Sequence, residues 1–237
     1  MAPLGLNSLN RIFLLAWTAG VGWMAERTPT VGPLPSPPAP GPLAAVPVAG
    51  LRYGALALVW LVGVVGVLAW QRTLWTTMGA GAGFRAETAH PLSLPRLTTT
   101  ARGRTITAET VRRGWSPLAT LRVEAALETT DPAAVFELEI TTDGDPAGKV
   151  LFEAPDADRR YVLTDGGGDV ESVLTTDFRA ELLEVETPGT LAVVGSHARY
   201  DVAQLPFDAA RLSTCARTTV RLAEQVEAAS GNRRGVD

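Results

Sequence analysis

The run Tyr53–Gln71 has the sequence YGALALVWLVGVVGVLAWQ, which is 19 residues without a charge between Arg52 and Arg72. A helix rises 1.5 Å per residue, so such a run covers about 28 Å, close to the roughly 30 Å hydrocarbon core of a bilayer. The run is apolar on all sides, whereas a helix on the surface of a soluble protein shows a polar face. We therefore predict a transmembrane helix over residues 51–75, with the lipid bilayer as its partner.

A second apolar stretch, Ile12–Ala25, lies within residues 1–27 and holds only 14 residues, which is short for a span. Three interpretations stay open: the core of a signal peptide, a short first span in a two-pass hairpin, or sequence upstream of a true start at Met24. A linker over residues 28–50 follows, because Thr28–Pro47 contains eight prolines. Proline fixes φ and removes backbone donors, so this segment is expected to be extended.

Glycines occupy positions 79, 81 and 83, just beyond the predicted span. Glycine is costly inside a helix because it loses more backbone freedom than any other residue. We therefore expect the helix to end or loosen here, and we predict a Gly- and Pro-containing hinge and linker over residues 76–96.

From residue 97 to residue 230 the hydrophobic pattern favours strands. Val135–Ile140 alternates cleanly, with Phe136, Leu138 and Ile140 on one face and glutamates on the other. Turn signals recur at intervals of about ten residues, which is typical of an antiparallel sandwich or barrel. The predicted fold class is α+β: an N-terminal transmembrane helix, then a mostly antiparallel β domain, sandwich- or barrel-like, with one C-terminal amphipathic helix.

Three later elements are predicted individually. Phe178–Glu186 is expected to be a strand with a bulge, because its apolar phase slips by one residue. Leu191–Tyr200 is expected to be a central strand, because it is apolar on both faces. Residues 208–229 are expected to form the helix, with Asp208 as its cap and Gly231 as its stop, and residues 231–237 a frayed tail.

Charge is distributed unevenly along the chain. The first 86 residues contain five arginines and one glutamate, a net charge of +4, and the rest contains 16 basic and 24 acidic residues, a net charge of −8. Binding to nucleic acid needs a cationic face, so no nucleic-acid partner is expected. The acidic part should also be repelled by anionic headgroups.

The arginines around the span favour an extracytoplasmic β domain if there is one span, and a cytoplasmic one if there are two.

Paired carboxylates in turns are the weak candidates for a metal site: Asp143, Asp145, Asp156 and Asp158, with Asp165 and Asp169 in a third acidic loop. Calcium prefers six to eight oxygen ligands from flexible loops, so two converging loops could hold it. Aspartate and glycine are also ordinary turn residues, and Ala147 and Ala154 stand where an EF-hand needs ligands. The favoured interpretation is plain turns, with no cofactor.

No catalytic residues are assigned. Cys215 is the only cysteine, so no internal disulfide can form. With His197 and Asp201 it supplies the residue types of a nucleophile, base and orienter, but it falls on the apolar stripe of the predicted helix and is expected to be a packed thiol. Arg102 and Arg104 are expected to be solvated arginines at a strand edge.

Three functional hypotheses follow. The preferred one is a non-enzymatic, membrane-anchored protein of the cell envelope, whose β domain binds or assembles with another envelope or membrane protein. It is favoured because the sequence shows no convergent catalytic set. The first alternative is an accessory subunit of a larger membrane complex. The second is a membrane-anchored hydrolase that uses the acidic loops. The sequence leaves the biochemical activity, the partner, the number of spans and the oligomeric state open.

Overall fold

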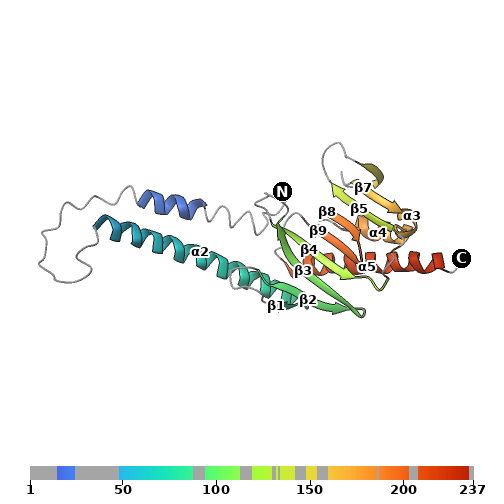
Figure 1. Ribbon diagram of the computed structural model, residues 1–237, viewed down its shortest axis with the longest axis horizontal. Helices are drawn as coiled ribbons and strands as arrows, with labels where there is room; N and C mark the ends of the chain where they lie inside the picture. Colours follow the sequence, from blue (N-terminus) through green and yellow to red (C-terminus); the bar gives the residue numbers. More distant parts are fainter. Residues whose placement is uncertain are drawn as a thin grey trace, which may run out of the picture. The chain divides into compact units, whose positions relative to one another are not determined.

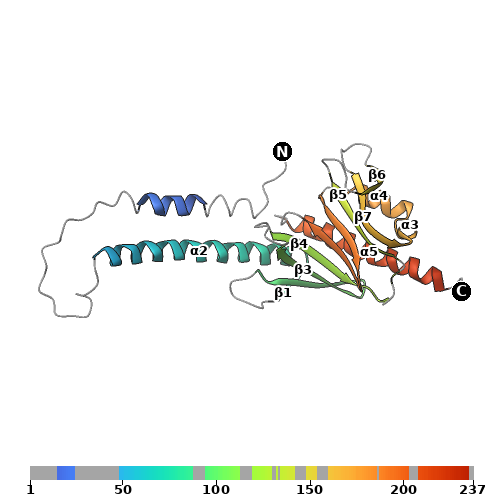
Figure 2. The ribbon, with the colours of Figure 1, turned by 45° about the horizontal axis from the view of Figure 1, so that its top comes forward.

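The structure is a computed structural model of the full chain. It describes residues 15–24, 48–87, 94–112, 119–129, 132, 134–141, 148–153, 160–185, 187–202 and 208–234. The chain divides into two compact units, Met1–Thr73 and Leu74–Asp237. The first unit is helical where it is described, and the second carries the sheet (Figures 1 and 2).

Two helical segments make up the described part of the first unit. Residues 15–24 are helical, and α2 (Val48–Gly81) begins in this unit. The segments lie side by side: the Trp17 ring fills the space above Gly63, where a Cβ atom would collide with it, and Trp60 Nε1 donates to Thr18 Oγ1 at 3.3 Å. Gly63 therefore permits the close approach of the two segments.

The apolar run predicted to span a membrane lies in α2. Among the described residues, Gly54–Gly81 is the single helical stretch that is long and apolar enough to cross a bilayer, judged by length and composition. Its side chains are exposed around the helix, including Leu58 at 61%, Val62 at 64% and Trp70 at 50%. The coarse prediction of one long apolar helix ahead of the sheet is confirmed.

The last turns of α2 belong to the second unit and are buried in it. Trp75 is fully buried, and its Nε1 donates to the carbonyl oxygen of Pro95 at 2.8 Å. The helix continues through Gly79. A Cβ at that position would lie 2.8 Å from Leu97 Cδ1, so glycine here allows α2 to pack closely against the segment that contains Leu97. The predicted loosening at this glycine therefore does not occur.

The helix stops two residues later in a Schellman motif. Gly83 has a φ of +80°, a conformation that favours glycine. The Phe84 N–H donates to Gly79 O at 2.8 Å, and the Gly83 N–H donates to Ala80 O at 3.0 Å. Among the three glycines, Gly83 is thus the one that ends the helix.

Within its described residues, the second unit continues with nine strands and three helices. They are β1 (Arg85–Glu87), β2 (Arg96–Ala101), β3 (Arg104–Arg112), β4 (Ala119–Ala126), β5 (Ala134–Thr141), β6 (Lys149–Glu153), β7 (Arg160–Gly168), α3 (Val170–Val173), α4 (Thr176–Leu183), β8 (Gly189–Val194), β9 (His197–Val202) and α5 (Ala209–Arg234).

The strands form one antiparallel sheet with the order β1-β2-β3-β4-β9-β8-β5-β7-β6. Among the described strands β1 and β6 are the two edges, and the helices contact β3, β4, β5 and β9. The α+β class and the antiparallel sheet are therefore confirmed. The prediction of a sandwich or barrel is wrong for the described strands, because the apolar face of this single sheet is covered by helices and not by a second sheet.

Strand register separates an apolar row from a charged row. Paired residues Leu97, Ala108, Val123, Tyr200, Leu191 and Leu138 cross six strands in line and are all fully buried. One residue along each strand, on the opposite face, Glu109 pairs with Arg122 and Arg122 with Asp201. Side chains alternate between the faces of a sheet, so the predicted alternation sets which face the helices cover.

α5 packs across the middle of the apolar face. Its predicted stripe, Leu212, Cys215, Thr219, Leu222 and Val226, is confirmed, since each of these residues is at most 2% exposed. Asp208 is confirmed as the cap, because its Oδ1 accepts from the Arg211 N–H at 2.7 Å. The helix does not stop at Gly231 but continues to Arg234.

Two strand predictions are wrong. Phe178–Glu186 contains the helix α4, because Thr175 Oγ1 accepts from the Phe178 N–H at 3.4 Å and starts a helical turn. Phe178 and Leu182 are buried at a spacing of four residues, so the apparent phase slip was the helical period. Leu191–Tyr200 is two strands, β8 and β9, joined by a turn in which Gly195 has a φ of +58°.

Candidate functional site

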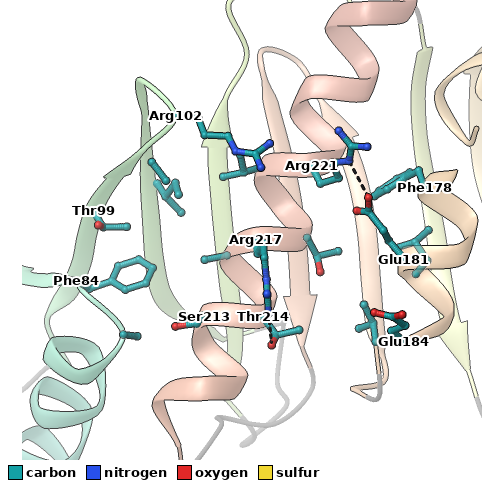
Figure 3. Close-up of a pocket in the computed structure, with 18 residues that line it drawn as sticks. Phe84, Thr99, Arg102, Phe178, Glu181, Glu184, Ser213, Thr214, Arg217 and Arg221 are labelled. Carbon is teal, nitrogen blue, oxygen red and sulfur yellow. Dashed lines mark hydrogen bonds and ion pairs between the residues drawn. The ribbon is translucent and has the colours of Figure 1, made fainter.

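A groove of about 740 Å³ follows the outer side of α5, and we call it the α5 groove. It is lined by residues from three regions of the second unit (Figure 3): Ala82, Phe84, Thr99, Ala101, Arg102 and Ile106 on one side, Phe178, Glu181, Leu182, Glu184 and Val185 on the other, and Ser213, Thr214, Ala216, Arg217, Thr218, Val220 and Arg221 on α5. Its size falls within the range of small-molecule sites.

The walls of the groove are rigid because they are parts of the core. Phe84, Ile106, Phe178 and Val185 are each at most 5% exposed. They come from the end of α2, from β3 and from the α4 region, so α5 lies between two fixed walls. The side chains that remain accessible in the groove are therefore mainly polar ones.

A chain of ion pairs crosses the outer side of α5 at one end of the groove. Arg102, in the tight turn between β2 and β3, donates through Nη1 to both carboxylate oxygens of Glu224, at 2.7 and 2.6 Å. Arg221 Nη1 contacts the same carboxylate at 3.4 Å, and Arg221 Nε donates to Glu181 Oε1 at 3.1 Å. The chain Arg102–Glu224–Arg221–Glu181 thus links the β2–β3 hairpin, α5 and α4.

The electrostatics of Glu224 reflect its place between two guanidinium groups. Burial acts to raise the pKa of Glu224, but hydrogen bonds and charges from Arg102 and Arg221 outweigh it and hold that pKa below its ordinary value. Glu224 is therefore ionised at neutral pH, and the two arginines are neutralised by it.

Two charged side chains of the groove have no ion-pair partner among the described residues. Arg217 is exposed on α5, and its only hydrogen bond there runs from Nη2 to Thr214 Oγ1 at 3.3 Å. Glu184, directly after α4, is exposed and forms no ion pair in the described part of the chain. Figure 3 places Arg217 on the central helix and Glu184 on the neighbouring wall. The groove therefore offers one cation and one anion that do not neutralise each other.

The chemistry of the groove is suited to binding. Of the described residues that line it, none is a histidine, cysteine or aspartate. Ser213 precedes Arg217 by one helical turn on the same side of α5, since residues four apart share a helix face. A guanidinium and a hydroxyl together match an oxyanion such as a phosphate or carboxylate.

A second ion pair fastens the far end of α5. Arg104 on β3 binds Glu227 through both terminal nitrogens, and its side chain is only 9% exposed. Glu227 Oε1 also accepts from the Glu128 N–H at 2.6 Å. The prediction of a solvated arginine is therefore wrong for Arg104, whereas Arg102 is still 64% exposed although it pairs with Glu224. Both arginines bind α5, because the hairpin turn brings them beside its glutamates.

The charged row on the other face of the sheet contains a buried carboxylate. Asp201 accepts from Arg122 at 2.9 and 3.1 Å, and its side chain is 2% exposed. Arg199 Nε lies 3.3 Å from the same carboxylate. Two arginines thus hold Asp201, so its role is structural.

The catalytic combination of Cys215, His197 and Asp201 is not assembled. Asp201 lies in the charged row, whereas Cys215 is 2% exposed on the buried stripe of α5 on the other side of the sheet. His197 is exposed at the start of β9. Burial raises the pKa of the Cys215 thiol to about 12, so it is not a thiolate at neutral pH.

The metal candidates Asp143, Asp145, Asp156 and Asp158 lie outside the described residues, so calcium binding there stays a prediction. Asp165 was expected in a loop but lies in β7, opposite Glu137 of β5. Asp169 caps α3 by accepting from the Ser172 N–H. Within the described ranges, no group of three His, Cys, Asp or Glu residues could hold a metal ion.

The α5 groove was not predicted from the sequence. A signal was present: Arg217, Arg221, Glu224 and Glu227 recur at steps of three and four on one side of the helix. Such a pattern usually marks a solvated helix face. The residues that face this side of α5 are set by pairing between strands that are far apart in the sequence, so the helix pattern does not identify them.

Comparison with known proteins identifies no family. No protein-family model matches the sequence, and no curated protein matches it. Among solved structures, the chain is similar to the mycobacterial trehalose monomycolate transport factor A, TtfA, with a TM-score of 0.46 and 9% identity over 65% of this chain and 93% of that chain. A likeness of this degree does not extend to function.

Proposed function

We propose that this chain is a membrane-anchored, non-enzymatic binding module of the cell envelope, in which α2 is the anchor and the α5 groove is the binding site. The observation that carries the proposal is the contrast along α2. Among residues 54–70 only Val67 is buried, whereas the last turns of α2 are built into the core of the second unit. Exposed apolar surface of this length is stable in lipid and costly in water.

One span is proposed rather than two. The apolar stretch Ile12–Ala25 holds 14 residues, which as a helix would rise about 21 Å, less than the roughly 30 Å hydrocarbon core. The packing of Trp17 over Gly63 supports a helical hairpin in the anchor, with α2 as its full-length span. With one span and the arginine-containing N-terminal tail inside, the sheet unit is extracytoplasmic. Cleavage of this unit by protease added to intact cells tests that side.

The anchor is tested by placing charges in α2. Arginine near the centre of a span costs roughly 2.5–3.5 kcal/mol in insertion experiments. The variant V62R/V65R is expected to move from the membrane pellet into the supernatant on alkaline carbonate extraction. Val194→Arg is the matched control, because Val194 is 49% exposed in the sheet unit, and it should stay in the pellet. If V62R/V65R is retained as well as the unaltered chain, α2 is not the anchor.

The accessory-subunit alternative differs from the binding module in what surrounds α2. In that case the exposed side chains Leu58, Val62 and Val65 would contact helices of other subunits and not lipid. Extraction in a mild detergent separates the two: a larger complex favours the accessory subunit, and a 25.0 kDa chain in its own micelle favours the module. The hydrolase alternative gains no support from the third acidic loop, because Asp165 lies in β7 and Asp169 caps α3. Its other two acidic loops lie outside the described ranges.

A further inference from the structure

We infer that the α5 groove binds the zwitterionic headgroup of a phospholipid, with the phosphate on Arg217 and the headgroup amine on Glu184. This inference rests on the proposed membrane anchor, because the anchor is what brings lipid to the groove. The groove has room for such a group, since it encloses about 740 Å³. All residues of the proposed site belong to the second unit.

Charge complementarity selects the ligand. Arg102, Arg221 and Glu181 are each held in ion pairs: Arg102 and Arg221 share the Glu224 carboxylate, and Arg221 also pairs with Glu181. Arg217 and Glu184 alone keep their charges available among the charged residues that the structure describes in the groove. A ligand that carries one negative and one positive group satisfies both, whereas a simple anion leaves the Glu184 carboxylate without a partner.

The positions on the helix favour a phosphate at Arg217. Ser213 lies one turn before Arg217 and has no hydrogen-bond partner among the described residues, so its hydroxyl can donate to the same oxyanion. The Thr214 hydroxyl already donates to Ala210 O at 3.0 Å and accepts from Arg217, which holds the guanidinium over this turn. Two donors therefore converge on one side of α5.

The net charge of the unit disfavours an anionic lipid. The residues after position 86 carry a net charge of −8, so an anionic membrane surface repels them. A zwitterionic headgroup has no net charge and avoids this repulsion. The selection of phosphoethanolamine over phosphoglycerol is thus a direct consequence of the charges on the unit.

The anchor keeps the groove close to lipid. Ala82, the first residue that lines the groove, follows Gln71 by eleven residues. Even a fully extended chain of that length reaches no more than about 40 Å. A headgroup within this radius is present at a high effective concentration, so weak contacts suffice for occupancy.

The test measures headgroup binding by the full chain in dodecyl maltoside micelles, which contain no phosphate. Saturation-transfer NMR compares three soluble probes: glycerophosphoethanolamine, glycerophosphoglycerol and inorganic phosphate. We expect the zwitterionic probe to bind most tightly. Arg217→Gln should weaken it about tenfold, and Glu184→Gln should weaken it about fivefold while leaving glycerophosphoglycerol unchanged or tighter, as expected for charge-assisted contacts.

The control is Arg211→Gln, because Arg211 is an exposed arginine on the same helix that does not line the groove. It should leave every affinity unchanged. Equal or tighter binding of inorganic phosphate identifies a site for free phosphate and overturns the inference. Binding that Arg217→Gln does not reduce, preference for glycerophosphoglycerol, or no binding of any probe also overturns it.

The failure of this inference can be told apart from failure of the anchor. Headgroup binding in micelles does not require α2 to cross a bilayer, and carbonate extraction does not depend on the groove. A chain that stays in the membrane pellet but binds no probe keeps the anchor and loses the headgroup site. A chain that binds the probe but is released by carbonate does the reverse.

Discussion

The two long helices of this protein, α2 and α5, differ in how they use apolar residues. α2 has 34 residues and is apolar around its whole circumference over residues 54–70, where every residue except Val67 is exposed or half-exposed. α5 has 26 residues, a buried stripe against the sheet and a charged outer side. The difference teaches that the arrangement of apolar residues, and not their number, indicates whether a helix faces lipid or a protein core.

α2 itself contains the same contrast over a single turn and a half. Trp70 is 50% exposed, whereas Trp75 is fully buried and hydrogen-bonded to Pro95. Two residues of one type, five positions apart, therefore have different roles. This pair gives the sharpest test of where the membrane segment ends and the folded unit begins.

The largest effect is expected for Trp75→Ala. Removing a fully buried tryptophan leaves a cavity and an unpaired carbonyl, at a cost of about 3–5 kcal/mol. Thermal unfolding of the full chain in detergent micelles, followed by circular dichroism, should show a large fall in Tm. Trp70→Ala is the matched control and should change Tm little. Equal effects of the two substitutions would place the boundary of the folded unit elsewhere.

A smaller effect is expected for Glu227→Gln on α5. It leaves the Arg104 guanidinium, whose side chain is 9% exposed, without its carboxylate, at a cost of about 1–3 kcal/mol. Glu139→Gln is the control, because Glu139 is exposed on β5 and has no ion pair among the described residues. Urea unfolding at neutral pH compares the two variants, and equal midpoints would show that the Arg104 pair contributes nothing.

Glu227→Gln also tests how the stability of the folded protein depends on pH. Burial acts to raise the pKa of Glu227, but the hydrogen bonds from Arg104 and the Glu128 N–H outweigh it and lower that pKa. A depressed pKa in the folded state stabilises the protein above the unfolded pKa of about 4.3, and this stability is lost as the pH falls through the folded value. Unfolding midpoints measured from pH 6 downward should therefore fall less steeply in Glu227→Gln than in the unaltered chain.

The smallest effect is expected at Cys215. Its thiol is buried and its pKa is raised to about 12, so iodoacetamide at pH 8 should not label the folded chain. Mass spectrometry should show one added group only after a denaturant is present. Rapid labelling without denaturant would mean that α5 does not rest with this stripe against the sheet.

Local pattern was enough for several elements. The alternation of Val135–Ile140 predicted β5, and the spacing of Leu212, Cys215 and Leu222 predicted the buried side of α5. It failed for α4, because the short segment around Phe178 and Leu182 fits a bulged strand and a helix equally well until the Thr175 cap is considered. Short apolar runs are ambiguous in this way, since a few residues do not distinguish a period of 2 from one of 3.6.

The candidate site could not be predicted, because its parts are distant in sequence. The pair Arg102 and Glu224 is separated by 122 positions and becomes adjacent only when the β2–β3 hairpin packs beside α5. The four aspartates chosen as metal candidates were selected by local composition. Local composition indicates turns but does not show whether two turns meet.

By itself, the sequence determined that one long helix is apolar on every side and that an acidic, strand-rich part follows it, because hydrophobic periodicity and net charge are local properties. Only the tertiary structure decided that the last turns of α2 belong to the core and that a single sheet is covered by helices. It also decided that Arg217 and Glu184 have no ion-pair partner in the described part of the chain. These features depend on strand register and on contacts across the fold, which no local pattern contains.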